Sequence, residues 1–168
     1  ASIVKLAGGL SDKSGNNFKT DLKSARTPWV ISSRLSPTDN LINLFYFEAL
    51  EQPGDWTNRN IKISIQDIKR STNDSTDFGM SSVVVRHLSD SDNVVRIIEQ
   101  FNNCDLNPQS LNYVARKIGT QQRVWDTDSR RLKLEGDWPN NSSHIRIVMN
   151  SAVDKGSTNA ALLPFGFK

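Results

Sequence analysis

The chain has 168 residues, which is enough for one domain with a buried core of its own. Its 21 basic residues exceed its 18 acidic residues by only three, and they are scattered rather than clustered as in nucleic-acid-binding proteins. A single cysteine excludes an internal disulfide. No apolar run approaches the roughly 18 residues of a membrane-spanning helix. We therefore expect neither a nucleic-acid partner nor membrane insertion.

Residues 1–40 are rich in polar and turn-forming residues, so they are predicted to be mostly loop, with one short strand at Pro28–Ile31. The apolar part of the N-terminus is too short for a signal peptide. The chain starts without methionine and stops on Phe165-Gly166-Phe167-Lys168, so both ends look like cuts. The loop-rich segment 1–40 either precedes an α+β domain at 41–168 or forms one domain with it.

From Leu41 onward, β-type patterns dominate the sequence. Residues 41–47 are aromatic and β-branched, and Ile61, Ile63 and Ile65 alternate with polar residues as in a strand with one wet face. Further strands are predicted at 83–88, 93–101 and 145–149, and residues 123–125 and 132–134 are predicted to pair as a hairpin.

One helix is predicted near 108–118. Pro108 stands at its start, Leu111, Val114 and Ile118 share a face, and Gly119 ends it. The predicted class is therefore α+β, a mainly antiparallel, sandwich-like sheet with this helix packed on it.

No catalytic motif is present, and each isolated candidate residue has an ordinary structural explanation. His87 ends a predicted strand, and His144, beside two serines, lacks the geometry that a triad requires. Asp126 and Asp128, with Glu135 further on, lack the glycine of a calcium-binding loop, so a polar hairpin tip explains them. Cys104 has no neighbouring base. We expect no catalytic residue, no metal site and no cofactor, and we predict that the chain is not an enzyme.

The four tryptophans permit two interpretations. They could form a stacking platform for sugars or single strands, or they could pack in and around a core. Core packing is favoured, because two of them follow Gly-Asp pairs at turns that lead into strands. The four are Trp29, Trp56, Trp125 and Trp138. Glycosylation sequons begin at Asn73, Asn140 and Asn141, although nothing else suggests secretion.

Four segments, in this order, resemble contractile phage tail sheath proteins of the large-myophage type. They are Pro53–Asn58 with the strand at 61–65, Glu99–Gly119, Gly136–Ile147 and Leu163–Phe167. The first is similar to a Pro-Gly-x-Trp-Gly-Asn turn and strand, with Thr57 in place of glycine. The second is similar to a Phe-Asn strand end followed by an Asn-Tyr helix. In the third, Trp138 stands where relatives often have tyrosine.

The resemblance implies a structural subunit that polymerises around the tail tube and contracts to drive the tube through the host envelope. Its partners would be other sheath subunits in a helical assembly, with the tube reached through parts outside this chain. The chain would then be an outer or middle piece, located in the virion tail after synthesis in the host cytoplasm. By itself it is expected to be monomeric.

Two other functions remain open on the sequence. One is a β-rich carbohydrate- or host-binding module of another tail component, for which an exposed tryptophan would be the stacking platform. The other is a hydrolase with a dispersed site, which would need a pocket that brings His87 or His144 together with carboxylates.

Overall fold

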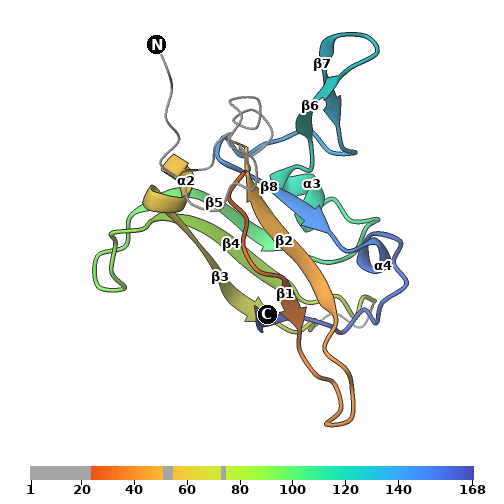
Figure 1. Cartoon of the computed structure of the whole chain (residues 1–168). Coiled ribbons are helices and arrows are strands. Elements are labelled where there is room, and N and C mark those ends of the chain that lie inside the picture. Colours follow the sequence, from red (N-terminus) through yellow and green to blue (C-terminus); the bar gives the residue numbers. More distant parts are fainter. Residues whose placement is uncertain (1–23, 51–54, 73–74) are drawn as a thin grey trace.

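The computed structural model describes residues 24–50, 55–72 and 75–168. In these residues, antiparallel sheet forms two layers with a separate hairpin (Figure 1). The four-stranded layer has the order β8-β2-β1-β9, and the three-stranded layer has the order β3-β4-β5. The strands are β1 Val30–Ser32, β2 Asn43–Ala49, β3 Ile61–Lys69, β4 Met80–His87, β5 Ile97–Cys104, β6 Gln122–Asp126, β7 Arg131–Glu135, β8 Ile145–Met149 and β9 Pro164–Phe167. The short helices are α2 Asp55–Asn60, α3 Val114–Ile118 and α4 Ser151–Asp154. The predicted sheet-dominated α+β class is confirmed.

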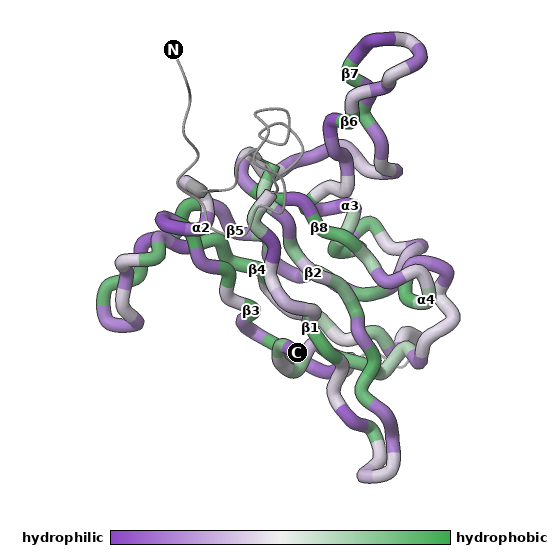
Figure 2. The backbone as a smooth tube through the Cα atoms, in the orientation of Figure 1, coloured by the Kyte–Doolittle hydropathy of each residue, from purple (hydrophilic) through white to green (hydrophobic). Residues whose placement is uncertain are grey.

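The hydrophobic core lies between the two layers, because both sheets contribute buried side chains to one cluster. Phe45 and Phe47 of β2 meet edge to face, with 5.4 Å between ring centroids. Val83 and Val85 of the central strand β4 belong to the same cluster. The apolar segments in Figure 2 follow these central strands, whereas the turn of the β6–β7 hairpin is hydrophilic.

The alternation predicted along β3 is confirmed. Ile61 belongs to the core cluster, and Ile63 and Ile65 pack against it. The strand pairs with β4 in register over this stretch, with Ile63 opposite Val85. Because successive side chains of a strand point to opposite faces, Ser64 lies on the outer face of the sheet.

We expect Ile63→Ala to lower the free energy of unfolding by about 2 kcal/mol, the low end for such truncations, because Ile63 is only partly buried. The matched control, Ser64→Ala, should change it by no more than about 0.5 kcal/mol. Urea denaturation of both variants measures the difference. Equal losses would show that the two faces of β3 are not distinguished by burial.

The helix predicted near 108–118 begins only at Val114, so the prediction is wrong for residues 108–113. The side-chain oxygens of Asp105, Asn107 and Ser110 each accept a hydrogen bond from the backbone N–H two residues ahead. Such local bonds offer the backbone an alternative to the helix and favour turns. The polar residues of this segment therefore form turns, although its apolar residues have helical spacing.

Helix α3 closes one side of the sandwich. Its residues Val114, Ala115 and Ile118 are buried, and Gly119 is its C-cap, as predicted. The Gly119 carbonyl accepts a hydrogen bond of 2.9 Å from the backbone N–H of Ile147, on the outer edge of β8. This contact covers part of the exposed edge of the four-stranded sheet.

The first forty residues contribute strand β1 to the four-stranded sheet. Strand β1 lies between β2 and β9, with Val30 opposite Phe45 on one side and Phe167 on the other. Val30 itself is fully buried in the core cluster. Residues 1–23 lie outside the described residues.

Candidate functional site

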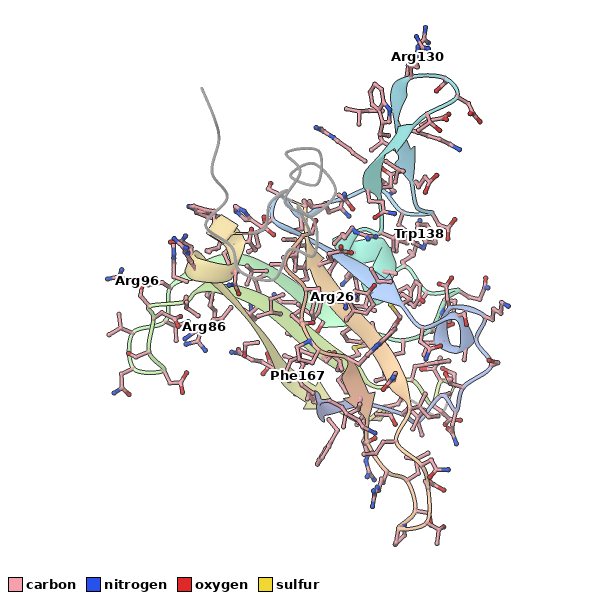
Figure 3. All side chains as sticks on the ribbon, viewed as in Figure 1. Arg26, Arg86, Arg96, Arg130, Trp138 and Phe167 are labelled. Atoms are coloured by element: carbon pink, nitrogen blue, oxygen red, sulfur yellow. The ribbon has the colours of Figure 1, made fainter. Side chains whose placement is uncertain are left out.

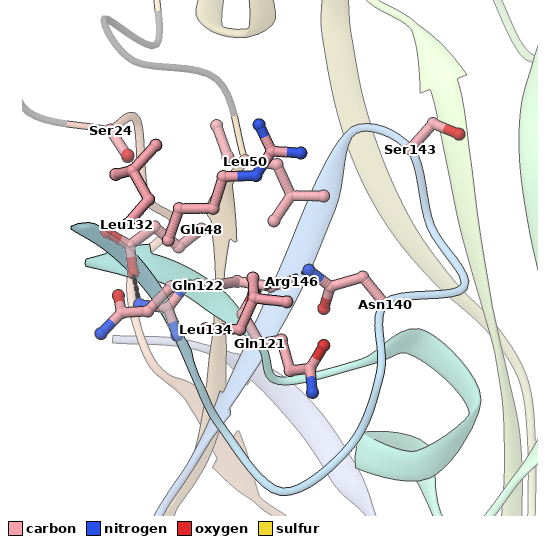
Figure 4. A pocket seen from close by; sticks show the side chains of 12 residues that line it. Ser24, Glu48, Leu50, Gln121, Gln122, Leu132, Leu134, Asn140, Ser143 and Arg146 are labelled. Carbon is pink, nitrogen blue, oxygen red and sulfur yellow. Dashed lines mark hydrogen bonds and ion pairs between the residues drawn. The ribbon is translucent and has the colours of Figure 1, made fainter. Parts of the chain in front are cut away.

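A cleft of about 610 Å³ lies between the β6–β7 hairpin and the β2 and β8 strands (Figure 4). The hairpin projects from the body of the protein, with Arg130 at its tip (Figure 3). The cleft is lined by Ser24, Glu48, Ala49, Leu50, Gln121, Gln122, Arg123, Leu132, Leu134, Asn140, Ser143 and Arg146. Polar and apolar side chains therefore both face its interior.

The hairpin has one apolar face and one charged face. Arg123 pairs with Leu134 and Trp125 pairs with Leu132, so these four side chains share a face. Leu132 and Leu134 line the cleft together with Arg123, which shows that this is the face turned toward the cleft. Trp125, one pair nearer the tip on the same face, is 58% exposed and is not among the residues that line the cleft.

The opposite wall is the outer face of β2 and β8. Glu48 and Arg146 stand opposite one another in the strand ladder and form an ion pair. The other guanidinium nitrogen of Arg146 donates to the Thr120 carbonyl at 3.2 Å. Arg146 is thus held by partners on two sides, whereas Arg123 makes no ion pair within the described residues.

The position of Asn140, which lines the cleft, depends on a close backbone approach at Gly119. Its φ of +111° is in the region that favours glycine, and an added Cβ would lie 2.4 Å from the Asn140 Cα. Asn140 in turn donates from its side chain to the Gln121 carbonyl at 2.7 Å. These contacts place Asn140 and Gln121 side by side at the cleft. Their importance could not be derived from sequence spacing, because 18 residues separate them in the chain.

Of the acidic residues that suggested a calcium loop, Asp126 and Asp128 lie at the turn of the hairpin, whereas Glu135 ends β7. The Asp126 carboxylate accepts hydrogen bonds from the backbone N–H of Asp128 and from the Ser129 hydroxyl, at 3.0 and 2.9 Å. The Ser129 hydroxyl bond lowers the pKa of Asp126, as do the backbone bonds. Across residues 24–50, 55–72 and 75–168, no group of three or more possible metal ligands gathers.

A second notable cluster centres on Asp90, in the turn between β4 and β5. The Asp90 carboxylate accepts a hydrogen bond of 2.7 Å from the Arg86 guanidinium and also pairs with Lys62 of β3. A backbone bond from Arg96 reaches the same carboxylate at 3.0 Å. The hydrogen bond from Arg86 is the main reason why the pKa of Asp90 lies well below its usual range. Asp92, almost fully exposed, pairs with Arg86 at 3.1 Å.

The Asp90 cluster holds an apolar turn against the sheet. Leu88, Val94, Val95 and Ile97 are all exposed beside it. Arg86 and Arg96 mark this end of the molecule in Figure 3, on the opposite side from the β6–β7 hairpin. Neither the cluster nor its apolar tip was identified from the sequence.

The individually considered residues are scattered, and the structure does not assemble them into a site. His87 is exposed at the end of β4, and His144 is half-buried beside β8. Cys104 is a free, buried thiol, and burial raises its pKa to about 11, consistent with a structural role.

The prediction that the tryptophans pack in the core is wrong for two of them. Trp56 is 46% exposed and stacks on the His144 ring, with 5.7 Å between centroids, and Trp125 is 58% exposed on the β6–β7 hairpin. Trp138 does pack against the core, with the Arg116 guanidinium over its ring. Trp29 is half-buried against Tyr46. The turn at Pro53-Gly54 and Asn73 lie outside the described residues.

Comparisons of the chain with known protein families, with curated proteins and with solved structures gave no match. Within the described residues, no helix is both long and apolar enough to cross a membrane.

Proposed function

We propose that this chain is a peripheral part of a structural subunit of a contractile phage tail sheath, which polymerises in the virion tail and drives the tube through the host envelope. Four sequence segments support the proposal by their resemblance to sheath proteins. In the fold, the second of them runs from β5 through its polar turn into α3, the third leads into β8, and the fourth contains β9. These segments serve the framework of the sandwich and its edges.

The observation that carries an assembly role is the apolar turn between β4 and β5. An exposed apolar group would be an ordinary feature on a flexible loop, but here the Asp90 carboxylate ties the turn to both β3 and β4. A surface held in one conformation before contact loses less entropy on binding. A rigid apolar projection therefore suits repeated contacts between neighbouring subunits.

Edge strand β9 offers a second contact surface of the same kind. Phe165 is 74% exposed, and Phe167 is also exposed although its backbone pairs with Val30. Large exposed aromatic side chains are common at protein interfaces. The two surfaces lie on different elements, as subunits that contact several neighbours require.

Immunogold electron microscopy on virus particles that carry the chain tests this function. Antibodies raised against the chain should label the whole length of the tail sheath, before and after contraction. Label confined to the baseplate, the fibres or the tail tip would contradict the sheath assignment and support a host-binding module instead. Tails from a virus that lacks the protein provide the control for antibody specificity.

The isolated chain is expected to be mainly monomeric at tens of micromolar. Its exposed apolar groups lie on separate projections, and the charges between them are of both signs, so a single contact between two copies is small. Exposed ion pairs contribute only about 0–1 kcal/mol each. Analytical ultracentrifugation should show one species near 18.8 kDa. Rings, tubes or a tight dimer would show a polymerising interface within this chain.

A further inference from the structure

We propose that the cleft between the β6–β7 hairpin and the β2–β8 strands is a binding site for an acidic oligosaccharide. This function is additional to assembly and does not depend on it. The cleft has a volume of about 610 Å³, within the range of small-ligand sites, and its lining combines apolar side chains with several convergent polar groups. Such a lining can contact both the polar and the apolar parts of a sugar.

The hydroxyl groups of a sugar both donate and accept hydrogen bonds, and so do side-chain amides. Gln121 lines the cleft, and its side-chain amide makes no hydrogen bond with any other described residue. This amide is therefore free to bond a ligand, whereas the side-chain amide of Asn140 already donates to the Gln121 carbonyl.

The apolar face of the hairpin suits the less polar face of a sugar ring. Leu132 and Leu134 are 64% and 59% exposed, and Trp125 continues the same face of the hairpin toward its tip. An aromatic ring presents a large rigid surface for stacking. A ligand entering the cleft would cover these side chains, which water surrounds in the free protein.

The charge of the cleft favours an acidic ligand. Two guanidiniums, from Arg123 and Arg146, line it with one carboxylate, from Glu48. Since Glu48 and Arg146 neutralise each other, Arg123 remains as the cation available to a ligand. A guanidinium binds a carboxylate with two parallel hydrogen bonds, which adds both affinity and orientation.

An extended peptide fits this cleft less well. Peptides commonly bind by adding a strand to an open sheet edge. Here the hairpin turns a side-chain face toward the cleft, and the backbone N–H of Ile147 on the outer edge of β8 already donates to Gly119. The available groups are those of side chains, as a sugar requires.

The test uses the whole 168-residue chain on an array of immobilised bacterial surface polysaccharides, some with uronic or sialic acids and some neutral. We expect binding to acidic members. For a bound acidic oligosaccharide in solution, Arg123→Gln and Trp125→Ala should each raise the Kd at least about tenfold. Isothermal titration calorimetry measures these changes.

Two matched controls separate the cleft from general effects. Arg131→Gln removes a cation from the opposite face of the same hairpin, and Trp56→Ala removes an exposed tryptophan of α2, away from the hairpin. Both should leave the Kd within about twofold. Amide chemical shifts in the wild-type chain, which require no variant, should change on titration around Gln121, Leu132 and Arg146.

Several results would overturn the proposal. These are no binding to any array member, equal binding of acidic and neutral members, or an Arg131→Gln effect as large as that of Arg123→Gln. Shift changes confined to residues outside the cleft would also contradict it. Because these experiments use the isolated chain, their outcome is independent of the antibody labelling of tails, which tests only the assembly role.

Discussion

Phe47→Ala is expected to lower the free energy of unfolding by about 3–5 kcal/mol, as truncation of a buried phenylalanine commonly does. Phe47 is 0% exposed, stands opposite Ile147 on β8 and contacts the ring of Phe45. Alanine would remove these contacts and leave a cavity between the two sheets, because the surrounding strands can collapse only in part. Urea denaturation followed by circular dichroism measures the loss.

Phe165→Ala is the matched control, since it removes the same side chain from the exposed edge strand β9. It should change the free energy of unfolding by no more than about 0.5 kcal/mol. A comparable loss in both variants would mean that Phe165 is covered in solution. A loss below about 1 kcal/mol at Phe47 would contradict a core shared by the two layers.

The strands were the part of the fold that could be predicted from the sequence, because their local pattern and their burial agree. Ile61, Ile63 and Ile65 alternate with polar residues, and that period places them on one face whatever the rest of the chain does. The aromatic segment at 41–47 and the strand at 145–149 also correspond to β2 and β8. Which strands pair depends on contacts distant in sequence, which no local pattern contains.

The helix shows that local hydrogen bonds can prevent a segment with helical spacing from forming a helix. Leu111, Val114 and Ile118 have helical spacing, yet Leu111 is exposed and precedes the helix. Side-chain bonds from Asn107 and Ser110 stabilise turns there. Residues of this type were visible in the sequence, but their competition with the helix depends on geometry that only the folded chain defines.

The cleft could not be predicted, because its walls come from segments far apart in the chain. Glu48 and Arg146 are separated by 98 residues and meet only through the β2–β8 pairing. The hairpin itself was predicted from residues 123–125 and 132–134. Nothing in that pattern indicates which face turns toward the body of the protein.

Replacing Asp90 by asparagine is expected to destabilise the protein markedly at neutral pH. The side chain of Asp90 is fully covered, and it neutralises two cations, Arg86 and Lys62. Asparagine keeps the shape but removes the charge, so it leaves the poorly exposed guanidinium of Arg86 without its main partner. Breaking such a pair costs more than the pair contributes, because the remaining charge is poorly solvated. The midpoint of urea unfolding at pH 7 should fall clearly.

Asp92→Asn is the control, because Asp92 pairs with the same arginine but is 95% exposed at its side chain. Its loss should shift the midpoint far less, since water solvates both groups when the pair is broken. If the two variants behaved alike, the buried position of Asp90 would have no energetic importance, and the apolar turn would not be held by this carboxylate.

The pH dependence of stability gives an independent test of the same cluster. The folded-state pKa of Asp90 is depressed, chiefly by the Arg86 hydrogen bond, whereas the pKa of an aspartate in the unfolded chain is about 3.9. A depressed pKa means that the unfolded chain takes up the proton first as the pH falls. The stabilisation is therefore complete above the unfolded pKa and is lost progressively below it, as the pH approaches the folded pKa. Urea midpoints measured from pH 7 to acid should show the gap between wild type and Asp90→Asn narrowing below about pH 4. A gap that stays constant into acid would show that the stabilisation does not depend on the charge of the Asp90 carboxylate.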